Sequence, residues 1–363
     1  MIKILNSELE NTWGGIESFL INVNHNINLE KIQFDYFMRG DNEEIEKNIE
    51  GRIFKVPNGC FKYVRFVRRK LLEEKYDIIH LHKNSAANLL LPILAKIYSK
   101  SSHIIIHAHN TQASDPNIIK YLLHHINRKM LDKIADSRFA CSEIAAEWLF
   151  GKKKHKKNPV YYVKNGISVK KYIYDTSIRK KIRKQLTIGE NIYLIGNVGR
   201  LYKQKNQMFL IDILAEVKKT YSDTKLILCG DGDLKNNLIQ KAVDLNVIND
   251  IIFMGECRNV NEILQAMDVF VMPSLYEGLT IAAIEAQCAG LPCVFSDTLS
   301  KETILTSQCI TLSLKENISV WSDSVLHFLH YERTDLSENI KKRGFDIQST
   351  VEFLDDYYTC TCE

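Results

Sequence analysis

The chain has 363 residues, more than the roughly 250–300 at which a single hydrophobic core usually stops growing, so we expect two domains. Its composition, 45% hydrophobic and 25% charged, is that of a globular protein, and no segment approaches the ~18 consecutive apolar residues of a membrane span. A net charge of +4 is too small to indicate a nucleic-acid partner.

The N-terminus and the cysteines favour a cytoplasmic protein. Met1 is followed by the strand-like run IKIL, which lacks the apolar stretch and cleavage site of a signal peptide. The nine cysteines show no paired metal-ligand spacing, and an odd number without a signal peptide fits a reducing compartment. We therefore expect neither export nor a structural metal.

Short β-branched runs alternate with amphipathic stretches along the whole chain, a pattern typical of α/β proteins with parallel sheets. In the first half we expect strands at 3–6, 33–38, 52–56, 77–82, 103–109, 138–142 and 160–165, and helices at 15–28, 63–75, 86–100 and 117–135. In the second half we expect strands at 193–199, 225–230, 251–255, 269–274, 292–297 and 309–313. Together they predict two doubly wound, Rossmann-like domains that join near 165–184 and face a central cleft.

The most informative segment is VFVMPSLYEGLTIAAIEAQCAGLP, which runs from Val269 to Pro292. It reads as a buried strand, a turn with Glu277 and Gly278, and a helix that begins near Leu279. The free N–H groups of the first helical turn and the helix dipole favour an anion there. Glu285 follows Glu277 by eight residues, about 800° of helical rotation, so both carboxylates can reach one ligand.

Carboxylates aimed at a phosphate would repel it, so these two should accept hydrogen bonds from sugar hydroxyls. A diphosphate flanked by two polyols is a nucleotide-sugar. The alternative is that Glu277 caps the helix and Glu285 lies on a solvated face.

Two further loops follow strands of the second half. Arg200 and Lys205 in GRLYKQKNQ can neutralise a diphosphate leaving group, although surface cations are common. Gly230 in GDGD predicts a tight turn where backbone approaches a ligand, and Asp233 could cap the next helix. The D-x-D in this turn could instead hold Mn²⁺ or Mg²⁺. Neither GNVGRLYKQKN nor the first βα turn supplies the G-x-G-x-x-G of a nicotinamide site.

Taken together, these motifs resemble the retaining nucleotide-sugar glycosyltransferases of family 4, which have the GT-B architecture. The resemblance spans nearly the whole chain and looks closest to the branch that builds bacterial capsular polysaccharide or exopolysaccharide. It is carried by GGIE (14–17), HAHN (107–110), FACSEIAAEWLFG (139–151), VKNGI (163–167), GRLYKQKN, GDG and the E-x₇-E segment. Ser168 departs from the Asp that often follows NGI in the family.

The resemblance implies domain roles and site residues. It implies an acceptor-binding domain at 1–170, a donor-binding domain at 171–345, and a last helix, 346–363, that crosses back to the first domain. It implies that Glu277 binds the transferred sugar, Glu285 the ribose, and Arg200 and Lys205 the phosphates. Further donor contacts would come from Gly14, Gly15, Gly230, Gly255, Arg258, Gly278, Leu279 and Thr280. His107 would meet the transferred sugar, and the sugar or acceptor pocket would include Glu17, His109, Asn110, Ser142 and Asn165.

The resemblance also implies retention of anomeric configuration without a metal or other cofactor, with UDP the expected carrier. The expected reaction moves a hexose or N-acetylhexosamine to a lipid-linked glycan acceptor. Two rivals stay open: a non-catalytic partner subunit of another transferase, and a nucleotide-sugar epimerase.

Basic clusters suggest a peripheral contact with an anionic membrane surface. Lys62, Arg65, Arg68, Arg69 and Lys70 interleave with apolar residues on an expected helix, and KKKHKK follows at 152–157. The alternative is a helix whose apolar side packs in the core while its basic face is solvated.

Overall fold

A computed structural model describes residues 1–11, 14–110, 117–151 and 159–363. The chain divides into two compact units, one of residues 1–167 with 344–363 and one of residues 168–343. The predicted boundaries, 170 and 345, lie close to these. The KKKHKK cluster lies outside the described residues.

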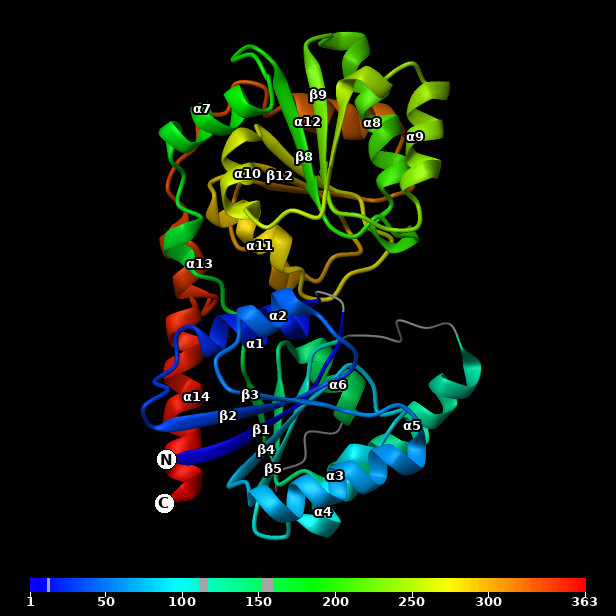
Figure 1. Ribbon diagram of the computed structural model, residues 1–363. Helices are drawn as coiled ribbons and strands as arrows, with labels where there is room; N and C mark the ends of the chain where they lie inside the picture. Colours follow the sequence, from blue (N-terminus) through cyan, green and yellow to red (C-terminus); the bar gives the residue numbers. More distant parts are fainter. Residues whose placement is uncertain (12–13, 111–116, 152–158) are drawn as a thin grey trace. The chain divides into compact units, whose positions relative to one another are not determined.

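Unit 1 is a parallel sheet with helices on both faces (Figure 1). Its seven strands run in the order β3-β2-β1-β4-β5-β6-β7. They are β1 (Ile2–Leu9), β2 (Ile32–Met38), β3 (Arg52–Lys55), β4 (Ile78–Lys83), β5 (His103–Ala108), β6 (Ser137–Ala140) and β7 (Val160–Tyr162). Its helices are α1 (Gly15–Asn24), α2 (Glu43–Lys47), α3 (Cys60–Glu74), α4 (Leu90–Tyr98), α5 (Ile118–Ile134), α6 (Glu143–Phe150) and α14 (Ile347–Cys362).

Two apolar layers hold unit 1 together. One packs α3, α4, α5 and α6 on one face of the sheet, and the other packs α1, α2 and α14 on the opposite face. The C-terminal helix α14 thus belongs to the core of the first unit, where Leu354 and Tyr358 are buried.

Unit 2 repeats this architecture with strand order β10-β9-β8-β11-β12-β13. Its strands are β8 (Tyr193–Val198), β9 (Thr224–Cys229), β10 (Ile251–Gly255), β11 (Val269–Met272), β12 (Cys293–Ser296) and β13 (Cys309–Leu312). Its helices are α7 (Thr176–Gln185), α8 (Gln207–Thr220), α9 (Lys235–Asp244), α10 (Val260–Ala266), α11 (Ile281–Cys288), α12 (Ile318–Leu326) and α13 (Ser337–Lys342), with short 3₁₀ turns η1 (Val169–Lys171), η2 (Lys203–Lys205), η3 (Ile248–Asp250) and η4 (Lys301–Thr303). Helices α8, α9 and α12 cover one face, and α7, α10 and α11 cover the other.

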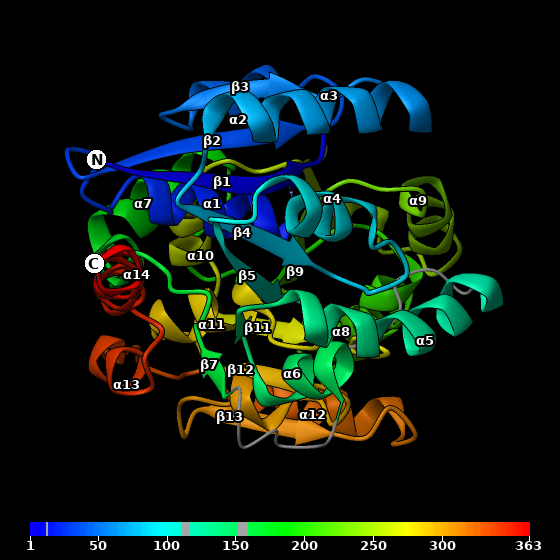
Figure 2. The same cartoon turned by 90° about the horizontal axis from the view of Figure 1, so that it is seen from below.

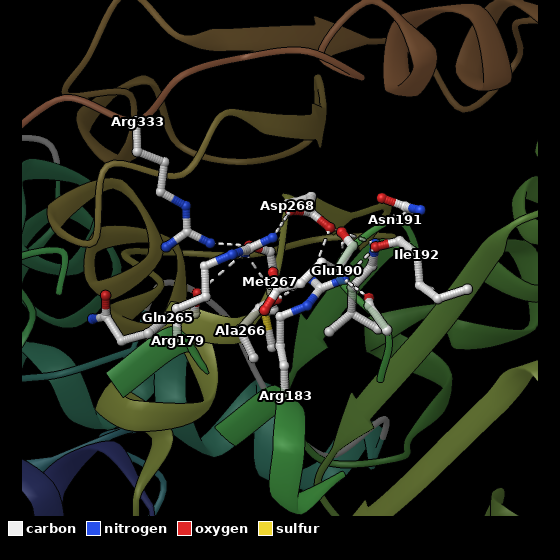
Figure 3. A network of polar contacts seen from close by, with 12 residues as sticks. Arg179, Arg183, Glu190, Asn191, Ile192, Gln265, Ala266, Met267, Asp268 and Arg333 are labelled. Atoms are coloured by element: carbon white, nitrogen blue, oxygen red, sulfur yellow. Dashed lines mark hydrogen bonds and ion pairs between the residues drawn. The ribbon is translucent and has the colours of Figure 1, made fainter. Parts of the chain in front are cut away.

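An arginine network around Asp268 fixes the amino ends of β8 and β11 (Figure 3). The Asp268 carboxylate accepts from Arg179 at 2.6 Å, from Arg183 at 3.2 Å and from the backbone N–H of Leu194 at 2.7 Å. These arginines and Arg333 also donate to carbonyls at the end of α10, which lack partners within the helix. The two central strands are therefore locked together at the edge opposite their functional loops.

The helix limits correct two sequence expectations. The helix expected at 86–100 begins only at Leu90, because the backbone before it is used by α5: the Ala86 N–H donates to His124, and the Ala87 carbonyl accepts from Asn127. The helix expected at 15–28 ends at Asn24.

Helix α3 carries the predicted basic cluster. Its apolar residues Tyr63, Val67 and Leu71 are buried in the core, while Arg65 and Arg69 lie on the outer side. The apolar side of α3 therefore packs in the core, and contact of its basic side with a membrane stays a prediction.

Candidate functional site

In unit 2 the loops that carry the predicted residues follow two neighbouring strands. The sheet order places β8 beside β11, the point where the strand order reverses. In doubly wound sheets, ligands bind at the carboxyl ends of the strands at this switch point. The loops at 199–206 and 273–280 leave these two strands and are the first candidates for a site.

Backbone hydrogen bonds tie these two loops together. The Leu275 N–H donates to the Gln204 carbonyl at 2.8 Å, and the Gln204 side chain donates to the Tyr276 carbonyl at 3.1 Å. The Asn206 side chain donates to the Pro273 carbonyl at 3.0 Å. The polar residues on either side of Lys205 therefore set the position of the loop that contains Glu277.

Lys205 and Glu277 form an ion pair, with 2.6 Å between Nζ and Oε1. Their side chains are only 17% and 8% exposed, so water screens this pair less than a surface pair. The other carboxylate oxygen, Oε2, accepts from the Thr280 hydroxyl at 3.2 Å. The structure thus joins three of the predicted residues in one cluster.

Helix α11 begins at Ile281, two residues later than expected, with Thr280 as its N-cap residue. Thr280 makes no side-chain capping bond, since its hydroxyl is directed to Glu277. The Ala283 N–H donates to the Thr280 carbonyl at 3.2 Å, while the dipole and the N–H groups that precede it at the helix start favour an anion. Gly278 and Leu279 lie in the turn beside this helix end, so the segment can bind an anion next to Lys205.

Glu285 lies on the second turn of α11 and is partly buried. Its Oε1 accepts from the Tyr172 hydroxyl at 2.5 Å. Burial raises the pKa of Glu285, and the Tyr172 hydrogen bond opposes that shift. Oε1 is thus held in place, while the second oxygen can accept from a ligand hydroxyl.

The GDG turn supports the Arg200 loop, and the approach of its backbone to a ligand stays a prediction. Gly230 has φ of +142°, and a Cβ there would lie 2.1 Å from the Gly199 carbonyl oxygen. A Cβ on Gly232 would likewise lie 2.7 Å from the Leu201 carbonyl oxygen. The Gly230 N–H donates to the Gly255 carbonyl at 2.7 Å. The glycines therefore allow one backbone segment to pack on another.

Asp233, Arg200 and Arg258 are further predicted residues of unit 2. Helix α9 begins after Leu234 without a side-chain cap, so Asp233 does not cap it as expected. Arg200 is exposed, with its guanidinium 5.9 Å from the Tyr202 ring centroid, and Arg258 is exposed beyond the end of β10.

In unit 1 the corresponding switch point, between β1 and β4, adjoins a cluster of histidines. His80 and His82 alternate on β4, and His107 and His109 lie at the end of β5. His82 is the register partner of His107, so period-two alternation puts the four rings on one face of the sheet.

The four rings form two hydrogen-bonded chains. In the first, the Tyr358 hydroxyl lies 2.7 Å from His80 Nδ1, and His80 Nε2 lies 3.2 Å from His107 Nδ1. In the second, Asn6 Oδ1 lies 3.2 Å from His82 Nε2, and His82 Nδ1 lies 2.8 Å from His109 Nε2.

Burial keeps these histidines neutral. Burial lowers the pKa values of His80 and His109 to about 3, and for His80 the neighbouring His109 contributes to this shift. Burial, followed by the other rings, also lowers the pKa values of His82 and His107 well below 6.5. Each ring therefore has one donor and one acceptor nitrogen, and hydrogen bonding decides which is which.

The second chain has a defined direction. With Asn6 Oδ1 as acceptor, His82 Nε2 carries the proton, and its Nδ1 accepts from His109 Nε2. His109 Nδ1 is then a bare acceptor, and it has no hydrogen-bond partner among the described residues. His109 is partly exposed, whereas His107 is fully buried, and the Nδ1 atom of His109 is itself buried.

His80, His82 and His107 could also be considered as metal ligands, because their ligand atoms lie within 4.8 Å of one another. Both ring nitrogens of His80 and of His82, however, already face protein partners. This pattern fits a hydrogen-bond relay better than a metal site.

The other predicted residues of unit 1 have mixed roles. Gly14 is the N-cap residue of α1 and Gly15 is exposed at its start, while the buried Glu17 accepts from the Glu10 N–H at 3.1 Å. Ser142 caps α6 through its side chain. Asn110 follows β5 and is partly buried, and the Asn165 side chain is buried, with Oδ1 unpaired within the described chain.

The sequence analysis does not identify Tyr172, Tyr358, Asn6, His80 or His82 as part of a site. The repeated H-x-H pattern at the ends of two expected neighbouring strands could have shown that four rings share one face. Nothing in the local sequence indicates the two tyrosines, which reach the sites from distant segments.

Comparison with known proteins identifies the family. Residues 13–171 match the model described as Glycosyltransferase Family 4, and residues 178–345 match that of glycosyl transferases group 1. Glycosyltransferase EpsF of Bacillus subtilis strain 168 is 30% identical over 96% of this chain and 94% of its own. The structure of Anabaena Alr3699/HepE in complex with UDP and glucose superposes with a TM-score of 0.81 at 18% identity, covering 99% of this chain and all of that one. WaaG, a glycosyltransferase of lipopolysaccharide biosynthesis, superposes with a TM-score of 0.75 at 14% identity over 98% and 99% of the two chains. With two Rossmann-like domains of GT-B type, the chain belongs to the family 4 glycosyltransferases.

Proposed function

We propose that this enzyme transfers a hexose or N-acetylhexosamine from a UDP-sugar to a lipid-linked glycan acceptor in bacterial polysaccharide synthesis. The Lys205–Glu277 pair beside the uncapped start of α11 carries the proposal. It combines a cation and an anion-binding helix end, which suit a diphosphate, with a carboxylate, which suits sugar hydroxyls.

The predicted site residues of unit 2 have separate roles in this proposal. The backbone at Gly278, Leu279 and Thr280 binds the diphosphate, and Lys205 and Arg200 neutralise it. Glu277 accepts from hydroxyls of the transferred sugar. Because Lys205 holds one oxygen of Glu277, the carboxylate can lie near a phosphate without strong repulsion.

Two more contacts complete the donor site. Glu285, held by Tyr172, accepts from ribose hydroxyls through its second oxygen. The segment from Gly255 to Arg258 lies beside the base.

The histidine cluster of unit 1 supplies a second, uncharged set of contacts. His109 Nδ1 accepts from a sugar hydroxyl, and His107 supports that ring from 4.0 Å between centroids. The neutral rings suit hydroxyls better than phosphates, which favour cations.

The names of similar proteins support the donor and acceptor classes. A relative from Escherichia coli, 24% identical over 85% of this chain, is named as a UDP-Gal galactosyltransferase acting on a GlcNAc-diphosphoundecaprenol. Structures titled as HepE with UDP or UDP-glucose have TM-scores of 0.81 and 0.80. Within the described ranges, no helix is both long and apolar enough to cross a membrane. We therefore place the enzyme at the cytoplasmic membrane surface, where a lipid-linked acceptor is available.

We also propose a retaining, metal-independent reaction in which the departing diphosphate takes the acceptor proton. Purified protein is incubated with UDP-hexoses and UDP-N-acetylhexosamines, with and without polyprenyl-diphosphate-linked sugars and with EDTA. We expect one donor to be consumed only when acceptor is present, at an unchanged rate in EDTA, with an α-linked product by NMR.

Other results would contradict the proposal in distinct ways. A β-linked product would exclude retention, and loss of activity in EDTA that returns with Mn²⁺ or Mg²⁺ would exclude metal independence. Isomerisation of donor without acceptor would indicate an epimerase. Activity only in a second transferase that co-purifies would indicate a non-catalytic subunit.

A further inference from the structure

Helix α5 presents its apolar residues to solvent. Five of them, Ile118, Ile119, Leu122, Ile126 and Met130, are between 49% and 67% exposed. Four are spaced by four residues, so they follow one side of the helix. A continuous exposed apolar stripe of this kind usually marks an interaction surface.

The opposite side of α5 is docked on unit 1 by specific contacts. The His124 ring stacks on Trp148 with 3.8 Å between centroids and accepts from the Ala86 N–H at 3.1 Å. Asn127 donates to the Ala87 carbonyl, and Leu131 is buried in the core. These contacts orient the helix, so its apolar stripe faces outward while a partly polar side faces the protein.

Charges on α5 are arranged for an anionic partner. Lys129 and Lys133 are exposed and lie seven residues after Leu122 and Ile126, close to two helical turns, so they continue the apolar stripe. The one carboxylate of the helix, Asp132, pairs with Arg138 at 2.8 Å. The apolar stripe is thus followed by two lysines on the same side.

The neighbouring helices extend this cationic surface. Helices α3, α4 and α5 pack on the same face of the sheet. The outer side of α3 adds Arg65 and Arg69, and Phe61 at its start is 82% exposed. Figures 1 and 2 both show α5 extending outward past the strands of unit 1.

We propose that α5 is a membrane-docking helix whose apolar stripe enters the acyl boundary of an anionic bilayer while Lys129 and Lys133 contact lipid phosphates. In a bilayer interface the apolar acyl layer adjoins the anionic phosphate layer, just as the apolar stripe of α5 adjoins Lys129 and Lys133. This docking goes beyond the transfer reaction, because vesicle binding needs neither donor nor turnover.

Vesicle flotation of the full-length protein tests this proposal. We expect binding to phosphatidylglycerol-containing vesicles at physiological salt, with about tenfold weaker binding to pure phosphatidylcholine. Ile119→Asn/Leu122→Asn/Ile126→Asn should weaken binding by about tenfold or more. Lys129→Gln/Lys133→Gln should remove most of the preference for anionic lipid.

Two controls separate docking from misfolding. Val243→Asn/Leu245→Asn replaces exposed apolar residues in unit 2 and should leave vesicle binding unchanged. Ile126→Trp should give indole emission that brominated lipids quench, which places this position in the bilayer.

The proposal is overturned if the wild-type protein does not float with anionic vesicles, or if the triple asparagine variant floats as the wild type does. Sedimentation equilibrium without lipid that shows an α5-dependent dimer would instead assign the stripe to a second copy of the chain.

Discussion

The two units share the same sheet topology but place side chains of different charge at the point where the strand order reverses. Each sheet reverses its strand order beside its first strand, β1 in unit 1 and β8 in unit 2. Near this point unit 1 gathers four neutral histidines, whereas unit 2 places a lysine–glutamate pair beside a helix start. The fold therefore determines where a ligand can bind, and the loop residues determine which ligand it is.

The difference follows from how each set of side chains is solvated. The histidines lie on strands inside the sheet, where burial disfavours a charged ring. Lys205 and Glu277 lie on loops beyond the strands, where they form an ion pair. Unit 1 can therefore discriminate by hydrogen-bond direction, and unit 2 by charge.

The largest expected effect is on catalysis and comes from removing the positive charge of Lys205 in unit 2. Lys205→Met should lower kcat/KM for the UDP-sugar by about 10² to 10³, because a cation that stabilises the leaving diphosphate is lost while Glu277 stays unpaired. Lys203→Met, on the same turn but exposed, is the matched control and should retain activity. Steady-state kinetics measure both.

The double variant Lys205→Met/Glu277→Gln extends this test. Since the two side chains are paired, its loss should be smaller than the product of the two single losses. Independent, multiplicative losses would show that the ion pair does not act as a unit.

The next effect concerns unit 1 and is a dependence of stability on pH. In the folded state, burial lowers the pKa of His80 and of His109 to about 3, against about 6.5 in an unfolded chain. Their contribution to stability is therefore complete above pH 6.5 and is lost as the pH falls toward 3. Each such histidine should reduce the unfolding free energy by about 1.4 kcal/mol per pH unit in this range.

Denaturant unfolding between pH 7 and pH 5, followed by fluorescence, measures this slope before most carboxylates titrate. His109→Gln should reduce the slope by about one proton even if it also shifts the midpoint. A slope equal to that of the wild type would mean that His109 has the same pKa in the folded and the unfolded chain.

The strands and the functional loops of both units are predictable from sequence, but the contacts between the loops are not. The β-branched runs predict every strand of both sheets, and GRLYKQKN and EGLT predict the loops of unit 2. The Lys205–Glu277 pair is not predictable, because it depends on β8 and β11 being neighbours although they are distant in sequence. The start of α4 is likewise set by contacts from α5 rather than by local propensity.

The glycines of GDG and the histidines of unit 1 also depend on neighbours that the local sequence does not indicate. Gly230 is required because the Gly199 carbonyl occupies the space that a Cβ would take, and no sequence pattern names that neighbour. The H-x-H repeats do indicate that four rings share a face. Their hydrogen-bond direction depends on Asn6, which lies on β1, far away in sequence.

The smallest expected effect follows from that direction. Asn6→Leu removes the acceptor for His82 Nε2–H, which frees His82 to reverse its tautomer and turn His109 Nδ1 from an acceptor into a donor. One lost hydrogen bond to a hydroxyl is worth about 1 kcal/mol, so we expect KM for the sugar to rise about fivefold with little change in kcat. Asn6→Asp keeps an acceptor at this position and should restore the wild-type KM.

Long-range ¹⁵N–¹H spectra of the His82 and His109 rings report their tautomers directly. A purely structural role of Asn6 would leave these tautomers unchanged in Asn6→Leu. If His109 Nδ1 is already protonated in the wild-type enzyme, the proposed direction of the chain is wrong, and unit 1 would offer a donor rather than an acceptor to the sugar.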